Sequence, residues 1–128
     1  MKALWLSNAF ATDHRLILVE SALDGLSHHQ LHRDAHARYA SSAGSMSPHQ
    51  LEVIGAAVAA MSPSATVVLA FDRDRDGDKL AEQVRAICSL PCERAASPIG
   101  KDWNDCLKAR ERAFVEAAER SRCAWLSR

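Results

Sequence analysis

The sequence predicts an α/β fold built on a mostly parallel, four-stranded sheet with helices on both faces. Two short and continuous apolar runs, 16–19 and 67–71, have the composition of strands that are buried on both sides. A segment with helical spacing of apolar residues follows each run. Alternation of strands and helices favours parallel pairing, because each crossover helix returns the chain to the same edge of the sheet.

The first strand and its helix occupy the beginning of the predicted sheet. The strand at 16–19 ends at Glu20, and Ser21 is a suitable N-cap for a helix over 22–33. The inward face of that helix is expected to carry three leucines, namely Leu23, Leu26 and Leu31. A second strand is expected over 37–43, and Trp5–Leu6 is a candidate for an additional edge strand.

The remaining elements continue the alternation. A helix over 48–61 starts at Ser47–Pro48, since proline is well tolerated at the first helical position. The strand at 66–71 is followed by a helix over 78–88 and a short strand over 91–96. A charged terminal helix is expected from 102 to 125. Its apolar stripe is Leu107, Phe114 and Ala118, and that of the 78–88 helix is Leu80, Val84 and Ile87. The 128 residues are expected to form one domain, 1–128.

Composition limits the classes of function. Sixteen basic residues balance sixteen acidic ones, so net charge gives no global argument for nucleic-acid binding. No apolar run approaches the roughly 20 residues that span a bilayer, and the N-terminus lacks a signal-peptide pattern. We therefore expect a cytoplasmic protein without a membrane partner. The four cysteines do not have zinc-site spacing and are expected to be reduced and packed.

An acidic run after the 66–71 strand is the main functional signal. Asp72, Asp74 and Asp76 alternate with arginines, and residues two apart in an extended chain point to the same side. Converging carboxylates repel each other unless a hard divalent cation binds them. Glu20 follows the other buried strand, so it is expected to meet these aspartates at the carboxyl edge of the sheet. Asp24 lies one helical turn after Glu20.

The polar residues allow three other interpretations. The Asp72–Gly77 segment resembles half of an EF-hand calcium loop. However, Gln83 stands where that loop needs a glutamate, and the segment follows an apolar strand where an EF-hand has a helix. Asp102 and Asn104 offer oxygen ligands, although a helix cap is the simpler role for Asp102. Histidines recur every four residues at His28, His32 and His36, but without an acid or cysteine partner we interpret them as solvated rather than zinc-binding.

Three motifs in order give the chain a resemblance to the Toprim domain of primases, topoisomerases, and OLD- and RecR-type proteins. They are Glu-Ser-Ala-Leu-Asp-Gly-Leu-Ser at 20–27, Asp-Arg-Asp-Arg-Asp-Gly at 72–77, and Gly-Lys-Asp-Trp-Asn-Asp at 100–105. The late motif makes the chain most similar to Toprim-like domains of plasmid and mobile-element primase and mobilisation proteins. The resemblance covers roughly residues 2–107.

The resemblance implies roles for individual residues. Glu20 matches the family's general acid/base or metal ligand, Asp72 and Asp74 its metal-binding pair, and Asp24 its secondary acid. Asp102 matches an acid found late in primases, whereas Asn104 stands where primases often carry a second acid. Asp76 replaces a small residue and is counted here as a possible added ligand. Three cations are candidates for contact with phosphate: Lys101, which we assign to the catalytic set, Arg73 and Arg75.

These roles together predict Mg²⁺- or Mn²⁺-dependent nucleotidyl or phosphoryl transfer on nucleic acid, with DNA as the expected partner in replication or plasmid mobilisation. A Toprim nuclease and a non-catalytic binding module are the alternatives. Such primases and mobilisation proteins carry further domains, so a helicase, a relaxase or a zinc-binding module is an expected partner.

Overall fold

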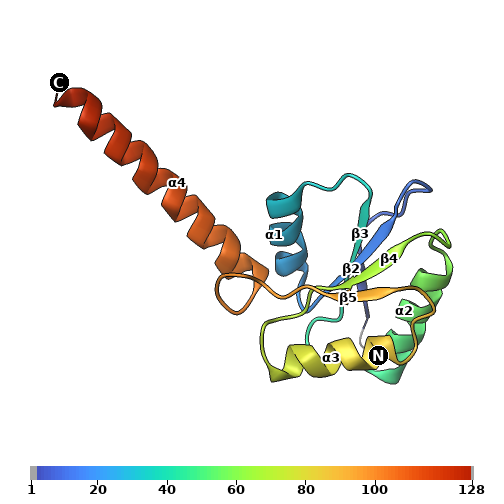
Figure 1. The fold of residues 1–128 in the computed structure, drawn as a ribbon. Helices are drawn as coiled ribbons and strands as arrows, with labels where there is room; N and C mark the ends of the chain where they lie inside the picture. Colours follow the sequence, from blue (N-terminus) through green and yellow to red (C-terminus); the bar gives the residue numbers. More distant parts are fainter. Residues whose placement is uncertain (1–2, 128) are drawn as a thin grey trace.

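A computed structural model describes residues 3–127, in which a five-stranded sheet is surrounded by four helices (Figure 1). The strands are β1 (Trp5–Leu6), β2 (Arg15–Val19), β3 (Ala37–Ser41), β4 (Thr66–Leu69) and β5 (Cys92–Arg94). The helices are α1 (Ala22–His32), α2 (Pro48–Ala59), α3 (Arg75–Arg85) and α4 (Trp103–Leu126). Met1, Lys2 and Arg128, which the expected 1–128 domain includes, lie outside the described residues.

The sheet has the order β1-β3-β2-β4-β5, and all pairs except β1 with β3 are parallel. The mostly parallel α/β fold is therefore confirmed, with one strand more than the four expected. That strand is the Trp5–Leu6 edge candidate, which runs antiparallel to β3. Ser7 fastens it, because its N–H donates to the Tyr39 carbonyl at 2.9 Å and its Oγ accepts from the Tyr39 N–H at 2.8 Å.

Helices cover both faces of the sheet, as expected. On one face, α2 and α3 pack Ile54, Val58 and Val84 against side chains of β2 and β4. On the other face, α1 and the start of α4 cover a second core that includes Ile17 and Trp103. Strands β2 and β4 are therefore buried on both sides. This explains the uninterrupted apolar runs in their sequences.

The inward face of α1 differs from the prediction. Leu23 and Leu26 are 56% and 62% exposed, whereas Asp24, Ser27 and His28 are buried. These polar side chains turn inward because the start of α4 and Tyr39 on β3 supply hydrogen-bond partners for them. Leu31 does pack against the second core, so apolar spacing alone misplaced two of the three leucines.

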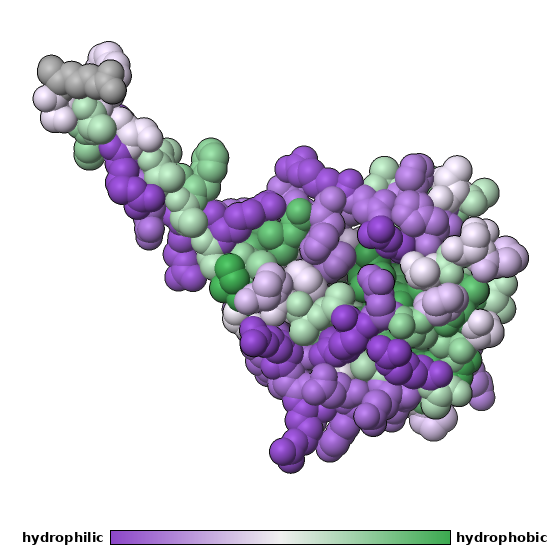
Figure 2. Space-filling view, viewed as in Figure 1, coloured by the Kyte–Doolittle hydropathy of each residue, from purple (hydrophilic) through white to green (hydrophobic). Residues whose placement is uncertain are grey.

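Helix α3 departs from its expected limits, and helix α4 departs from its expected packing. Helix α3 begins at Arg75, three residues before the predicted start, and ends at Arg85, so that Ile87 is exposed rather than packed. Helix α4 extends far from the domain (Figure 2), and Phe114 on its expected apolar stripe is 76% exposed. The four cysteines are free thiols, and Cys123 on this helix is exposed rather than packed. Across residues 3–127, none of the helices is long and apolar enough to cross a membrane.

Candidate metal centre

The carboxyl ends of β2 and β4 lie side by side at the centre of the sheet, where the strand order reverses. From β2 the chain passes through α1 to β3 on one side, and from β4 it passes through α3 to β5 on the other. Such a switch point leaves an open crevice that is the usual ligand site of open α/β sheets. Here Glu20 and Asp72 meet across it, since Glu20 Oε1 accepts a hydrogen bond from the Asp72 backbone N–H at 3.2 Å.

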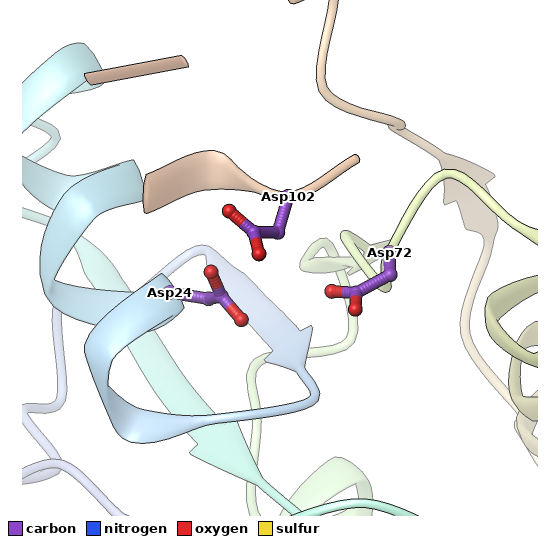
Figure 3. Close-up of side chains that lie close together, drawn as sticks. All are labelled: Asp24, Asp72 and Asp102. Atoms are coloured by element: carbon purple, nitrogen blue, oxygen red, sulfur yellow. The ribbon is translucent and has the colours of Figure 1, made fainter. Parts of the chain in front are cut away.

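Three carboxylates converge beside this crevice from three separate segments. Asp24 comes from α1, Asp72 from the loop after β4, and Asp102 from the residue before α4 (Figure 3). One oxygen of each lies within 4.8 Å of an oxygen of the other two. A single ion can therefore reach a ligand atom from each segment, although the three residues span most of the chain.

Local structure holds two of these carboxylates in place. Asp24 Oδ2 accepts from the Ser21 hydroxyl at 2.8 Å, and Asp24 Oδ1 accepts from the Asn104 N–H at 3.3 Å. Asp102 is the N-cap of α4, where its Oδ1 accepts from the Asp105 N–H at 2.8 Å. The expected capping role of Asp102 is thus confirmed, and the cap bond engages one of the two Asp102 carboxylate oxygens.

The Gly-Lys-Asp-Trp-Asn-Asp motif at 100–105 anchors the start of α4 beside the carboxylate cluster. Trp103 is buried on the sheet, and its Nε1–H donates to the Ala70 carbonyl at 2.9 Å. Gly100 has a φ of 74°, and a Cβ there would lie 2.5 Å from Asp105 Cβ. Only glycine fits that close, left-handed turn without strain. The Lys101 carbonyl accepts from the Arg73 N–H at 2.6 Å, which joins this loop to the loop after β4.

The loop after β4 depends on two residues that sequence reasoning did not single out as site residues. Arg94 on β5 donates to the carbonyls of Leu69, Phe71 and Asp72 at 2.9, 2.7 and 2.7 Å. Gly77 lies under the same loop, where a Cβ would be 2.0 Å from the Asp72 carbonyl oxygen. Gly77 could have been flagged, because glycine directly after an acidic run marks a close backbone approach. No sequence signal connects Arg94 to a loop more than twenty residues earlier.

The electrostatics of the site disfavour three negative charges without a cation. Burial, followed by repulsion from Glu20 and Asp24, raises the pKa of Asp72 to about 7. Burial also raises the pKa values of Glu20 and Asp24, and repulsion from Asp102 adds to the rise at Asp24. Crowded carboxylates of this kind hold protons more tightly unless a positive charge lies among them.

Asp72 offers a direct test of whether a cation fits. Its Oδ1 is buried and finds no hydrogen-bond partner among residues 3–127. An unpaired buried carboxylate oxygen is costly, and a metal ligand is one of the few roles that explain it. The donor set consists only of carboxylate oxygens, which suits hard cations such as Mg²⁺ and Mn²⁺ rather than zinc. The residues present therefore fit a divalent cation.

The other predicted site residues surround the cluster. Asp74 caps α3 by accepting from the Gly77 N–H at 2.7 Å, a bond that lowers its pKa, and Lys101 Nζ lies 3.3 Å from Asp74 Oδ2. Asp76 is exposed in the first turn of α3 and does not share the side of Asp72, because the chain becomes helical after Asp74. It lines a hollow of about 420 Å³ together with Glu20.

The three histidines do not form a metal site. His28 is buried, in contrast to the solvated side chain expected, and its Nδ1 lies 2.7 Å from the Tyr39 hydroxyl. Its ring stacks on His32 and contacts the edge of Trp103. His36 lies beyond the end of α1 at His32, as expected. The rings of His28 and His32 therefore form part of the packing between α1 and α4.

Comparison with known proteins agrees with this architecture. A family model described as Toprim-like matches residues 17–107, which is most of the chain. The chain belongs to the Toprim-like family. The matched region contains all three carboxylates of the cluster, Arg94 and the start of α4. No curated protein sequence is similar enough to count as a match.

Two solved structures from bacteriophage T7 share the fold. One is the crystal structure of the primase fragment of the T7 primase-helicase protein, with a TM-score of 0.61 and 21% identity over 84% of this chain and 44% of that one. The other is a complex of the T7 lagging-strand DNA polymerase with primase domains of two gp4 subunits bound to an RNA/DNA hybrid and dTTP. Its match has a TM-score of 0.61 and 20% identity over 84% of this chain and 54% of that chain. This Toprim-like chain therefore spans about half the length of the structures it matches.

Proposed function

We propose that this Toprim-like chain binds Mg²⁺ or Mn²⁺ through Asp24, Asp72 and Asp102, and that it takes part in metal-dependent nucleotidyl or phosphoryl transfer on nucleic acid. The observation that carries the proposal is the convergence of these three carboxylates, one of them with an unpaired buried oxygen, at the switch point of the sheet. When bound, such an ion polarises phosphate oxygens and offsets the charge that grows in the transition state.

The proposed ligand set differs in part from the set that the family resemblance suggests. Asp72 belongs to both sets. Asp74 has its carboxylate engaged as a helix cap and in an ion pair with Lys101, and so we assign it to the positioning of the loop and of that lysine. Asp76 is exposed on α3, which supports a role outside the ligand set.

Two residues beside the cluster have proposed roles toward a nucleic-acid substrate. Lys101 is exposed on its loop, and its Nζ lies 3.3 Å from the Asp74 carboxylate. A phosphate group that approaches the cluster would find this ammonium group as an electrostatic contact. Glu20 borders both the cluster and the hollow under α3, a position suited to holding or moving a proton at its carboxylate oxygens.

A binding experiment tests the metal part of the proposal. Isothermal titration of the metal-free protein with Mn²⁺ and Mg²⁺ should give one ion per chain. Asp72→Asn should weaken binding at least about tenfold, because a charged ligand with an otherwise unpaired oxygen is lost. The matched control is Glu52→Gln, which removes an exposed carboxylate on α2 and should leave the affinity unchanged. Equal binding by the wild type and Asp72→Asn would contradict the proposed ligand set.

An activity assay tests the nucleic-acid part. The T7 primase structures share only the fold at this identity, so a primase-like reaction is a proposal for this chain and a further domain or partner is expected to contribute to it. Helicase, relaxase and zinc-module partners remain predictions. Mn²⁺-dependent primer synthesis or strand cleavage that is lost in Glu20→Gln would support catalysis. Nucleic-acid binding without turnover in every metal and template condition would instead favour the non-catalytic module.

A further inference from the structure

The C-terminal part of α4, residues 111–126, stands clear of the domain, and we call it the arm (Figures 1 and 2). Every residue of the arm is exposed. Helix α1 accompanies α4 only as far as Arg110, whose guanidinium donates to the Gln30 carbonyl at 3.5 Å. An isolated helix of this length is marginal in water, because most helical stability in proteins comes from tertiary packing. Within residues 3–127 the arm therefore lacks the tertiary packing that usually stabilises a helix.

A narrow stripe along the arm is free of charge. Phe114, Val115, Trp125 and Leu126 are 76%, 53%, 71% and 66% exposed. Phe114, Ala118, Ser121 and Trp125 recur at spacings of four, three and four residues, so at 3.6 residues per turn they fall within a sector of about 60°, the apolar side of the arm. Val115 and Leu126 lie beside this sector, with Glu111 and Arg122 between. The opposite side carries Arg112, Glu116 and Arg120. This amphipathic pattern is typical of a helix that packs against another helix.

The structure also limits how another helix can approach. A hollow of about 620 Å³ opens where α1 stops, lined by Arg33, Arg110, Glu111, Phe114 and Val115. A helix laid along the apolar side has to end in this hollow, because α1 occupies the continuation of that side toward the domain. The tip of the arm, with Trp125 and Leu126, has the apolar character that such a position needs.

We propose that the arm is a dimerisation helix that packs antiparallel against the arm of a second copy of this chain. A two-fold arrangement places each tip in the hollow of the other copy, with Trp125 opposite Phe114 of the second copy. The small residues Ala118 and Ser121 then meet at the middle, where the helix axes can approach closely. A symmetric pair satisfies both arms with the same contacts, as closed two-fold interfaces do.

Charge and area support a second copy as the occupant. Glu119 and Arg122 lie on either side of the midpoint, so the two-fold axis brings Glu119 of each copy near Arg122 of the other. Neither residue takes part in an ion pair among residues 3–127. The four exposed apolar side chains offer on the order of 500 Å² per copy, or about 1,000 Å² in the pair. That area is at the lower end of specific interfaces, where weak and transient complexes are found.

Sedimentation of the full chain under reducing conditions tests the proposal. From about 1 to about 300 μM, the mass should rise from 14.0 kDa toward twice that value. Phe114→Glu and Trp125→Glu should each remain monomeric, whereas the control Arg120→Ala, on the opposite side of the arm, should dimerise like the wild type. Their domains should unfold at the wild-type temperature, since the substituted side chains are exposed. A wild type that stays monomeric at every concentration would overturn the proposal.

A charge-exchange experiment tests the antiparallel arrangement itself. Glu119→Arg and Arg122→Glu should each weaken self-association at least about tenfold, because like charges then face each other across the axis. A one-to-one mixture of the two variants should recover dimers, since each copy supplies the charge that the other lacks. If the mixture stays as monomeric as the separate variants, the two arms do not pair in this way.

Discussion

The strongest consequence of the carboxylate cluster is that removing one of its charges should stabilise the metal-free protein. We expect Asp72→Asn to raise the free energy of unfolding at pH 8 in the presence of a chelator. The pKa of Asp72 is raised from its ordinary value of 3.8 to about 7, so its ionised form is less compatible with the folded state than with the unfolded chain. An asparagine has nearly the same shape and avoids this repulsion.

The size of the effect follows from the same shift. At about 1.4 kcal/mol for each tenfold change in proton affinity, the full shift corresponds to about 4 kcal/mol. The side chain is only partly buried, so solvent screening reduces the expected gain to about 1–2 kcal/mol, or about 3–8 °C in Tm. Because the pKa of Asp72 is higher in the folded protein than in the unfolded chain, protonation of this carboxyl group favours folding. That stabilisation is complete below the unfolded pKa of 3.8 and is lost as the pH rises through about 7. The gain should therefore be present at pH 8 and absent near pH 4.

Urea unfolding followed by circular dichroism measures this difference. Saturating Mn²⁺ should reverse the order, because at about 100 times the dissociation constant a bound ligand adds about 2.7 kcal/mol to the wild type. Asp72→Asn should gain much less from the metal. A variant that is less stable than the wild type at pH 8 without metal would refute the electrostatic reasoning.

Three other perturbations have defined outcomes. Gly77→Ala should destabilise the domain by about 3 kcal/mol or more in urea unfolding, because the new Cβ would lie 2.0 Å from a backbone oxygen. The control Gly55→Ala, whose Cβ would have nothing within 4 Å, should be neutral or should stabilise the domain by up to about 1 kcal/mol. Arg94→Ala should cost about 2 kcal/mol and weaken Mn²⁺ binding in calorimetry, since three carbonyls of the site loop lose their donor; unchanged affinity would contradict this positioning role. His28, whose pKa burial lowers to about 3, should cost about 2 kcal/mol of stability as the pH falls from 7 to 5, because the unfolded chain takes up the proton below about pH 6.5. His28→Gln should flatten that dependence when both proteins carry Asp72→Asn, and an equally steep profile would exclude His28 as its source.

Much of the fold could be predicted because the central strands leave clear patterns. The runs that became β2 and β4 are apolar throughout, since both faces of each strand are covered. Ser47–Pro48 indicated the start of α2, and the structure has a full capping box there. The local sequence of α1 could not reveal that the polar residues Asp24 and His28 would face inward. That face is set by partners on α4, about eighty residues away.

The candidate site was predicted in location more than in detail. Parallel strands bring their carboxyl ends to one edge, so the meeting of Glu20 and Asp72 followed from the order of elements alone. The spacing of Asp72, Asp74 and Asp76 suggested one shared side only on the assumption of an extended chain. The chain instead enters α3 after Asp74, which turns Asp76 away. Asp102 joins the cluster through the packing of Trp103 on the sheet, a tertiary contact that spacing does not encode.

The most direct test of the account is the position of a bound metal ion. We predict that a crystal soaked with Mn²⁺ will show one anomalous peak between the carboxylates of Asp24, Asp72 and Asp102, with oxygen ligands at roughly 2.0–2.3 Å. The same peak should be missing in crystals of Asp72→Asn. A peak at Asp74 and Asp76 instead, or none at a saturating Mn²⁺ concentration, would contradict the proposed metal centre.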